Sequence, residues 1–101
     1  PAKGAEIAKT RPALVMNLPA VGRLPLRIVV PLTDWKPAYA SVPWLVHLKP
    51  TAGNGLSKDS AADAFQVKSV SVDRFDSKLG TVIADQLEQI SAAIALCVGA
   101  P

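Results

Sequence analysis

Prolines and glycines divide this 101-residue chain into short segments, and this constrains its fold more than any other feature. Nine prolines and six glycines are present, and before residue 80 no long stretch free of them shows a helical repeat. Proline removes a backbone hydrogen-bond donor and glycine leaves the backbone unrestricted, so both oppose helix propagation. The first 80 residues are therefore expected to form short strands joined by turns.

Apolar runs between these breaks predict the strands. The strongest run is centred on Ile28, Val29 and Val30, and its continuous apolar character indicates burial on both faces. Asn54-Gly55, between two later runs, is typical of a tight hairpin turn. The expected strands are residues 12–18, 26–33, 42–49, a return at 56–60 and 65–72, and a last short strand at 81–83.

One segment, residues 85–98, has the period of an amphipathic helix. A small sheet of antiparallel strands with this helix packed across it is the expected fold, mainly β with a C-terminal α-helix. So many short strands in one domain, residues 1–101, favour a curled, barrel-like sheet. The apolar stripe of the helix consists of Leu87, Ile90, Ile94 and Cys97.

Positive charge is concentrated near the start of the chain. The sequence has 11 Lys and Arg against 8 Asp and Glu, and this net charge of +3 alone is too small to indicate nucleic-acid binding. In the first third, six basic residues are opposed only by Glu6 and Asp34, so a basic surface is expected there. The six are Lys3, Lys9, Arg11, Arg23, Arg27 and Lys36.

Cys97 is the only cysteine and His47 the only histidine of the sequence. An internal disulfide and a cysteine-based metal cluster are therefore excluded within one chain, both residues are expected to be structural, and no metal or cofactor is expected. A reducing, cytoplasmic setting is expected. No signal peptide is visible, and no apolar run reaches the roughly 20 residues needed to span a membrane.

Polar side chains gather where loops meet strands. The standard catalytic motifs, such as phosphate-binding glycine loops and metalloprotease helices, are missing from the sequence. Arg11 joins a charged loop to a buried strand, and Thr33 ends the next strand. An arginine held at such a seam can direct its fixed fork of donors at a phosphate. The other polar residues at these seams are Glu6, Lys9, Asp34 and Lys36.

Four motifs follow one another along the chain. The first is Gly4-x-Glu6-(x)4-Arg11-Pro12, which leads into an apolar strand, and the second is Pro31-Leu32-Thr33. In this order and spacing they resemble the PemK/MazF family, the mRNA interferases of type II toxin–antitoxin systems, and the similarity extends over essentially the whole chain. The remaining motifs are Gly55-Leu56-Ser57-Lys58-Asp59-Ser60 and Gln66-Val67-Lys68-Ser69.

The resemblance implies an SH3-like small barrel of the CcdB–PemK type, a homodimer, and metal-independent cleavage of single-stranded RNA. In this reaction the 2′-hydroxyl attacks the adjacent phosphate. The resemblance places Arg11 and Thr33 at the scissile phosphate and gives Glu6 a proton-accepting role. A guanidinium is suited to stabilise charge that grows on phosphate oxygens. The implied inhibitor is a cognate antitoxin whose acidic, initially disordered tail occupies the basic groove.

Further residues are expected to bind RNA around this pair. Lysines near it can contact phosphates, and an aromatic ring in a basic loop can stack on a base or fill the dimer interface. The candidates are Lys9, Trp35, Lys36, Lys58 and Gln66.

The chain departs from the family pattern at two places. Phe65 stands where many members have an Asp before the residue equivalent to Gln66. A core position is expected for this Phe, with base stacking as the alternative. The apolar strand with which the family begins does not precede Gly4, so a barrel lacking its first strand is expected.

Two other functions stay open. A CcdB-type relative of the same fold binds DNA gyrase and cuts no RNA, and a second relative would bind RNA without cleaving it. The presence of both Arg11 and Thr33 favours the endoribonuclease, whereas Phe65 and the missing first strand keep the inactive relative open.

Overall fold

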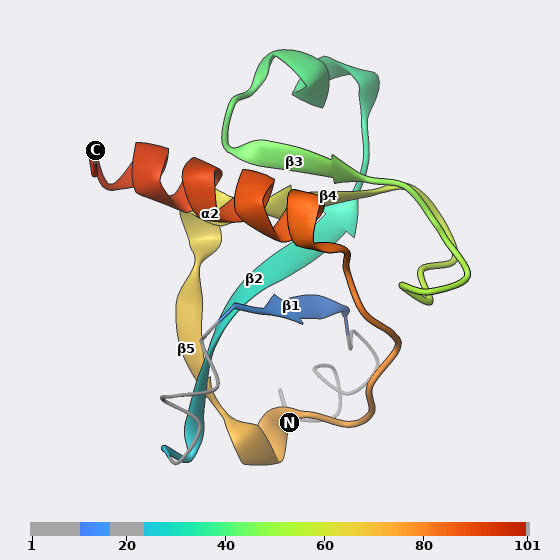
Figure 1. Cartoon of the computed structure of the whole chain (residues 1–101), viewed down its shortest axis with the longest axis vertical. Coiled ribbons are helices and arrows are strands. Elements are labelled where there is room, and N and C mark those ends of the chain that lie inside the picture. The colour runs from blue at the N-terminus through green and yellow to red at the C-terminus, as the bar shows by residue number, and fades with distance from the viewer. Residues whose placement is uncertain (1–10, 17–23, 101) are drawn as a thin grey trace, which may run out of the picture.

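The computed structural model describes residues 11–16 and 24–100. Within these ranges, five strands are followed by one α-helix near the C-terminus, and three short 3-10 helices lie in the connections (Figure 1). The strands are β1 (Ala13–Val15), β2 (Leu26–Asp34), β3 (Leu45–Leu48), β4 (Ser60–Asp63) and β5 (Lys68–Ser71). The helices are η2 (Pro37–Ser41), η3 (Ala64–Gln66), η4 (Val72–Arg74) and α2 (Ala84–Cys97).

The long strand β2 connects the whole sheet. Its first part pairs with β1 on one side and with β5 on the other, whereas its end pairs with β4, which in turn pairs with β3. All four pairings are antiparallel. The expected fold, mainly β with a C-terminal helix, is confirmed, and the described strands need no closed barrel to form it.

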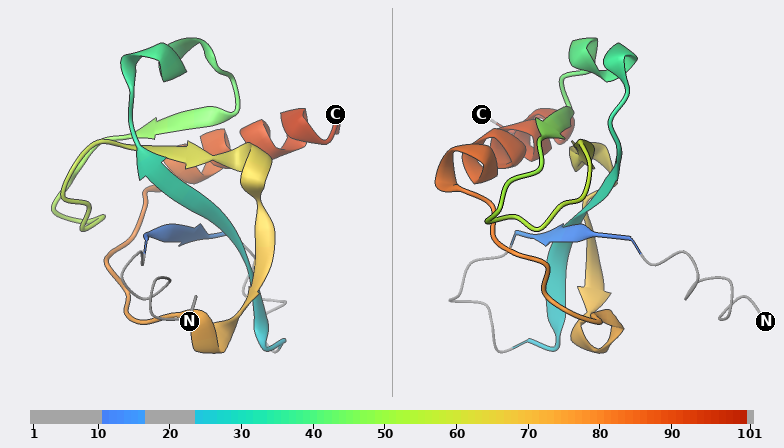
Figure 2. Two further views of the ribbon diagram at one scale, coloured as in Figure 1. Left: turned by 180° about the vertical axis from the view of Figure 1, so that it is seen from behind. Right: turned by 90° about the vertical axis from the view of Figure 1, so that its right-hand side faces the viewer.

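One face of this sheet packs against α2, which crosses it (Figure 2). Alternate residues of β2, β3 and β4 point toward the helix, and the predicted apolar stripe of α2 meets them. Leu48 and Ile90 are both completely buried at this contact. Burial of such side chains is the main source of stability for a domain of this size. The buried cluster is Val30, Leu32, Val46, Leu48, Ala62, Ala64, Ile90 and Ala93.

The predicted return strand is broken into two, which the apolar pattern did not indicate. The Oδ1 of Asp63 accepts a hydrogen bond from the backbone N–H of Phe65, 3.2 Å away, and so caps the short helix η3. The chain thereby leaves the β3 side of the sheet and rejoins it as β5 beside the first part of β2.

Two other predicted strands are wrong in part. Residues 42–44 precede β3 in an irregular segment, so only Leu45–Leu48 of the expected 42–49 pairs with β4. Residues 81–83 form no strand, because the N–H of Thr81 donates to the carbonyl of Gly53 (2.8 Å) and Ile83 caps α2. Of the expected strand 12–18, the described part pairs as Ala13–Val15.

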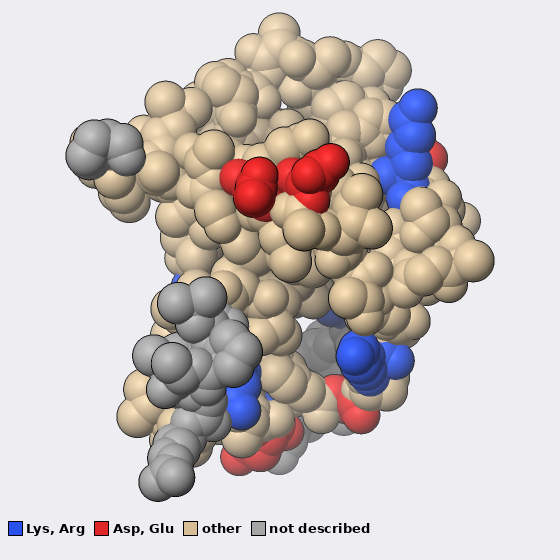
Figure 3. All heavy atoms as spheres, viewed as in Figure 1, with Lys and Arg blue, Asp and Glu red and all other residues tan. Residues whose placement is uncertain are grey.

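Within the described ranges, no helix is both long and apolar enough to cross a membrane. The face of the molecule shown in Figure 3 carries acidic side chains over α2, whose acidic residues Asp85 and Glu88 are both exposed. Lys and Arg side chains also appear on this face (Figure 3).

Candidate active site

Arg11 lies just before β1, and Thr33 lies near the end of the neighbouring strand β2. Ala13 pairs with Pro31, and the N–H of Leu32 donates to the carbonyl of Pro12 across 3.1 Å. Continuing this register places Arg11 beside Thr33. Arg11 is exposed and Thr33 half-buried, so the guanidinium can reach a ligand that rests on the threonine.

These two residues share a hollow of about 540 Å³ with the loop between β3 and β4. One side of the hollow is the edge formed by β1 and the end of β2, and the other is the segment around Lys58. Two cationic groups and several hydroxyls thus converge on one space, which is the composition that a phosphate requires. The polar residues that line it are Arg11, Thr33, Asp34, Ser57, Lys58 and Ser60.

Asn54 organises the loop that forms the second side. Asn54 is only 6% exposed. Its Oδ1 accepts hydrogen bonds from the N–H groups of Thr51 and Leu56, both at 3.0 Å. Its Nδ2 donates to the carbonyl of Lys49 at 2.8 Å. The predicted Asn54-Gly55 turn therefore exists, but it lies inside a longer loop and not in a two-residue hairpin.

Two glycines let this loop touch the segment that leads to α2. Gly55 has a φ of +68°, and a Cβ built on it would lie 2.2 Å from the carbonyl oxygen of Leu79. A Cβ on Gly80 would lie 2.3 Å from the carbonyl oxygen of Gly53. Only glycine allows such a close approach of two backbones, so these residues hold the Lys58 side of the hollow in place.

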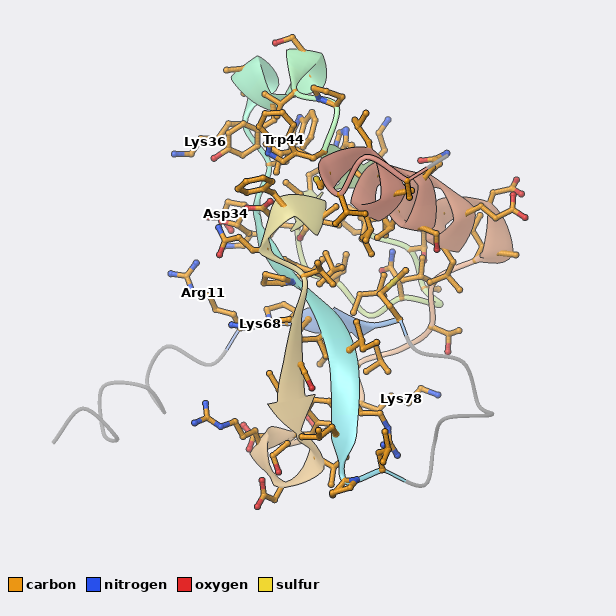
Figure 4. All side chains as sticks on the ribbon, turned by 90° about the vertical axis from the view of Figure 1, so that its left-hand side faces the viewer. Arg11, Asp34, Lys36, Trp44, Lys68 and Lys78 are labelled. Carbon is orange, nitrogen blue, oxygen red and sulfur yellow. The ribbon has the colours of Figure 1, made fainter. Side chains whose placement is uncertain are left out.

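An ion pair crosses the hollow. The Nζ of Lys58 lies 2.9 Å from Oδ1 of Asp34, the residue that follows Thr33 in the sequence. The hydrogen bond and charge of Lys58, followed by the charges of Arg11 and Lys36, hold the pKa of the Asp34 carboxyl below its ordinary value of 3.8. Figure 4 shows Arg11, Asp34, Lys36 and Lys68 on the side of the sheet that faces away from α2.

Lys58→Ala is expected to raise the pKa of Asp34 toward 3.8, because the largest contribution that favours its carboxylate is then lost. Since the folded-state pKa is lowered, the pair stabilises the fold fully above the unfolded value and ceases to do so as pH falls through the folded-state pKa. NMR titration of the Asp34 carboxyl carbon measures this shift. Lys49→Ala, which removes an exposed lysine outside the hollow, is the control and should leave that titration unchanged.

Trp35 and His47 form a stacked pair beside the hollow. Their rings are parallel within 2°, and their centroids are 4.0 Å apart. The Nε2 of His47 lies 2.7 Å from Oδ2 of Asp59, and the N–H of Trp35 donates to the carbonyl of Asp59 at 3.2 Å. The histidine expected to be structural is thus half-buried and joined to the loop that carries Lys58.

Phe65 contradicts the expectation of a core position. It is 66% exposed, and its ring meets that of Trp44 at a centroid distance of 5.9 Å. The neighbouring Gln66 donates from Nε2 to Oδ2 of Asp63 at 2.9 Å, so both residues are held on η3. Phe65 is therefore on the outer side of η3, whereas the preceding residue, Ala64, is buried in the core.

The structure adds one basic residue to the site, and two predicted site residues are not among those it describes. Lys68 is exposed on the same side as Arg11 (Figure 4), a position that only the pairing of β5 with β2 reveals. Glu6 and Lys9 lie outside the described residues, and their predicted roles stay predictions. Within residues 11–16 and 24–100, no three His, Cys, Asp or Glu side chains gather as metal ligands would.

Comparison with known proteins identifies relatives of the same fold. A solved structure of the Mycobacterium tuberculosis toxin MazF-mt6 superposes with a TM-score of 0.76 at 22% identity, over 90% of this chain and 88% of that one. A mycobacterial endoribonuclease solved in complex with its cognate antitoxin has a TM-score of 0.73 at 23% identity, over 90% and 82%.

The Deinococcus radiodurans MazE–MazF structure has a TM-score of 0.72 at 26% identity, over 90% of this chain and 84% of that one. No curated protein sequence matched the chain. The family model that describes the PemK-like, MazF-like toxins of type II toxin–antitoxin systems matches residues 1–98. The chain therefore belongs to the PemK-like, MazF-like toxin family.

Proposed function

We propose that this protein is an endoribonuclease that cuts single-stranded RNA without a metal ion. The observation that carries the proposal is the convergence of Arg11, Thr33 and Lys58 on one hollow. Family membership supports it, as does the similarity to a protein described as a mycobacterial endoribonuclease. No described residue at this site favours the alternative function of a gyrase-directed toxin.

The proposed reaction is an intramolecular displacement at phosphorus. The 2′-oxygen of one ribose bonds to the adjacent phosphorus and loses its proton, and the bond from phosphorus to the 5′-oxygen of the next nucleotide breaks. The products are a 2′,3′-cyclic phosphate and a 5′-hydroxyl, whose oxygen takes up a proton. Negative charge grows on the non-bridging oxygens meanwhile, and preorganised donors aimed at those oxygens lower the barrier.

Each side chain of the hollow has its own role in this reaction. Among the described residues, Arg11 forms no ion pair, so its fork of N–H donors is available to the phosphate oxygens. The Thr33 hydroxyl donates to the same oxygens or orients the 2′-hydroxyl. Lys58 reaches a phosphate once Asp34 releases it. Glu6 is the proposed proton acceptor for the 2′-hydroxyl.

The proposed partners are an antitoxin and a second copy of the chain, and both relate to the same basic side of the sheet. An antitoxin with an acidic tail would occupy it in competition with RNA, in keeping with the antitoxin complexes known for the similar mycobacterial and Deinococcus radiodurans proteins. A homodimer would place two such sides next to each other and lengthen the track for one RNA strand.

The proposal predicts cleavage of single-stranded RNA in excess EDTA. The products should end in a cyclic phosphate, and an all-deoxy strand of the same sequence should stay intact. Thr33→Val, which keeps the shape of the side chain, should slow cleavage by about 10- to 100-fold, the cost of roughly one hydrogen bond to a charged group. Cleavage products resolved on a denaturing gel give the rates. RNA that binds and stays uncut in a mixture of all sequences would favour the inactive relative.

A further inference from the structure

Three residues beside the hollow contact one another in a closed set. Trp35 stacks on His47, whose Nε2 lies 2.7 Å from Oδ2 of Asp59. The set is closed by the N–H of Trp35, which donates to the carbonyl of Asp59 at 3.2 Å. Within residues 11–16 and 24–100, His47 is the one partner of the Asp59 carboxylate. Asp59 is therefore held by its side chain as well as by its backbone.

This closed set adjoins both members of the ion pair in the hollow. Asp34 directly precedes Trp35 in the chain, and Lys58 directly precedes Asp59. Asp34 pairs with Ser60, so the bond from Trp35 to Asp59 extends the ladder between β2 and β4 past the end of β2. A displacement of Asp59 would therefore move the backbone from which Lys58 reaches Asp34.

Strand register brings His47 to Asp59. His47 pairs with Ala61 in β4, and Asp59 lies two positions before Ala61. Residues placed diagonally across an antiparallel pair lie within reach of long or aromatic side chains. The Asp59 carboxylate is thereby drawn toward β3. Its two neighbours, Lys58 and Ser60, line the hollow, whereas Asp59 does not.

We infer that His47 is a positioning residue of the proposed active site, which fixes Lys58 in the hollow through its hydrogen bond to Asp59. The inference rests on the proposed function, since Lys58 is there assigned to the phosphate. Lysine has a flexible four-carbon stem, so the position of its ammonium depends on a fixed backbone. Donors that are preorganised before the reaction are those that lower the barrier. His47 would thus act without contacting RNA.

Replacements of His47 separate the hydrogen bond from the ring stack. His47→Gln keeps an N–H donor for Asp59 and removes the ring, whereas His47→Phe keeps a ring and removes the donor. His47→Met, which is close to glutamine in length and has no donor, gives a second comparison. All three new side chains are uncharged, so the charge beside the hollow is matched. Circular dichroism and urea denaturation establish which variants are folded.

The ion pair can be followed in the protein alone, by NMR titration of the Asp34 carboxyl carbon. Contact with Lys58 is the largest contribution that lowers the pKa of Asp34. The pKa of Asp34 is therefore expected to be higher, and nearer its ordinary value of 3.8, in His47→Phe and His47→Met than in His47→Gln. A side chain that served only to stabilise the fold would leave this titration the same in all folded variants.

Cleavage provides the second measurement. At saturating RNA, single-turnover cleavage by His47→Phe and His47→Met is expected to be about 10-fold slower than by His47→Gln, because a misplacement of 1 Å can cost about 100-fold in rate. The donor-keeping variant should therefore recover most of the rate that the other two lose.

The outcomes distinguish this inference from the proposed function. Equal Asp34 titrations in the three folded variants would overturn the inference, even if wild-type protein cuts RNA. Equal cleavage rates in the three would overturn it as well. If wild-type protein cuts no RNA, the proposed function fails, whereas a titration that separates His47→Gln from the other two variants would still support the placement of Lys58 by His47.

Discussion

Arg11→Ala is expected to lower the rate constant of RNA cleavage by about 10²- to 10³-fold, which is the usual cost of removing one preorganised donor from a developing oxyanion. Arg11 is exposed, and no described residue pairs with it, so its loss should leave the fold intact. Single-turnover cleavage of a saturating RNA measures the chemical step apart from binding.

Two further variants sharpen this experiment. Arg11→Lys keeps the charge but loses the planar fork of donors, and its rate should fall between those of wild type and Arg11→Ala. Lys36→Ala removes an exposed cation outside the lining of the hollow, and it should change RNA affinity more than the rate at saturation. Cleavage by Arg11→Ala at the wild-type rate would rule out the proposed role of the guanidinium.

Gly55→Ala is expected to lower the free energy of unfolding by about 2 to 5 kcal/mol, since a left-handed backbone and an overpacked contact each cost roughly 1 to 3 kcal/mol. The new Cβ would clash with the carbonyl of Leu79, which is backbone and cannot rotate away. The loop that carries Lys58 must then separate from the segment before α2. Urea denaturation gives the change in free energy, and the cleavage rate should fall with it.

Gly53→Ala provides the matched control in the same loop. Its φ is not positive, and the nearest atom to its added Cβ is Oγ1 of Thr51, at an ordinary contact distance of 3.9 Å. Its stability should therefore stay within about 0.5 kcal/mol of wild type, as at most surface positions. Equal stability of the two variants would mean that the loop does not depend on its contact with Leu79.

The sequence predicted those parts of the fold that depend on local periodicity. The repeat of Leu87, Ile90 and Ile94 located α2 within one residue at each end, and the apolar run around Val29 located β2. The break at η3 escaped prediction, because it depends on a hydrogen bond from Phe65 to Asp63 that no apolar pattern reveals.

The candidate site was predictable to a similar extent. Arg11 and Thr33 came from motif spacing, and the structure brings them together in one hollow. The contacts between Asp34 and Lys58 and between His47 and Asp59 join residues 24 and 12 positions apart in the chain. Such pairs depend on the register of β2, β3 and β4, which residue types along one strand do not specify.

The ion pair between Asp34 and Lys58 also bears on how RNA binding would respond to salt. A lysine that meets a phosphate ordinarily displaces a counterion from the nucleic acid into solution, and this release makes affinity fall as salt rises. Lys58 already has a carboxylate partner, which must be pushed aside when a phosphate arrives. Part of the electrostatic free energy gained on phosphate binding is then offset by the loss of the ion pair between Lys58 and its carboxylate partner. This contact therefore adds less affinity than the charge of Lys58 suggests. If the proposed RNA site is correct, Asp34 would compete with phosphate for Lys58 and would favour RNA strands bound at several points over single anions.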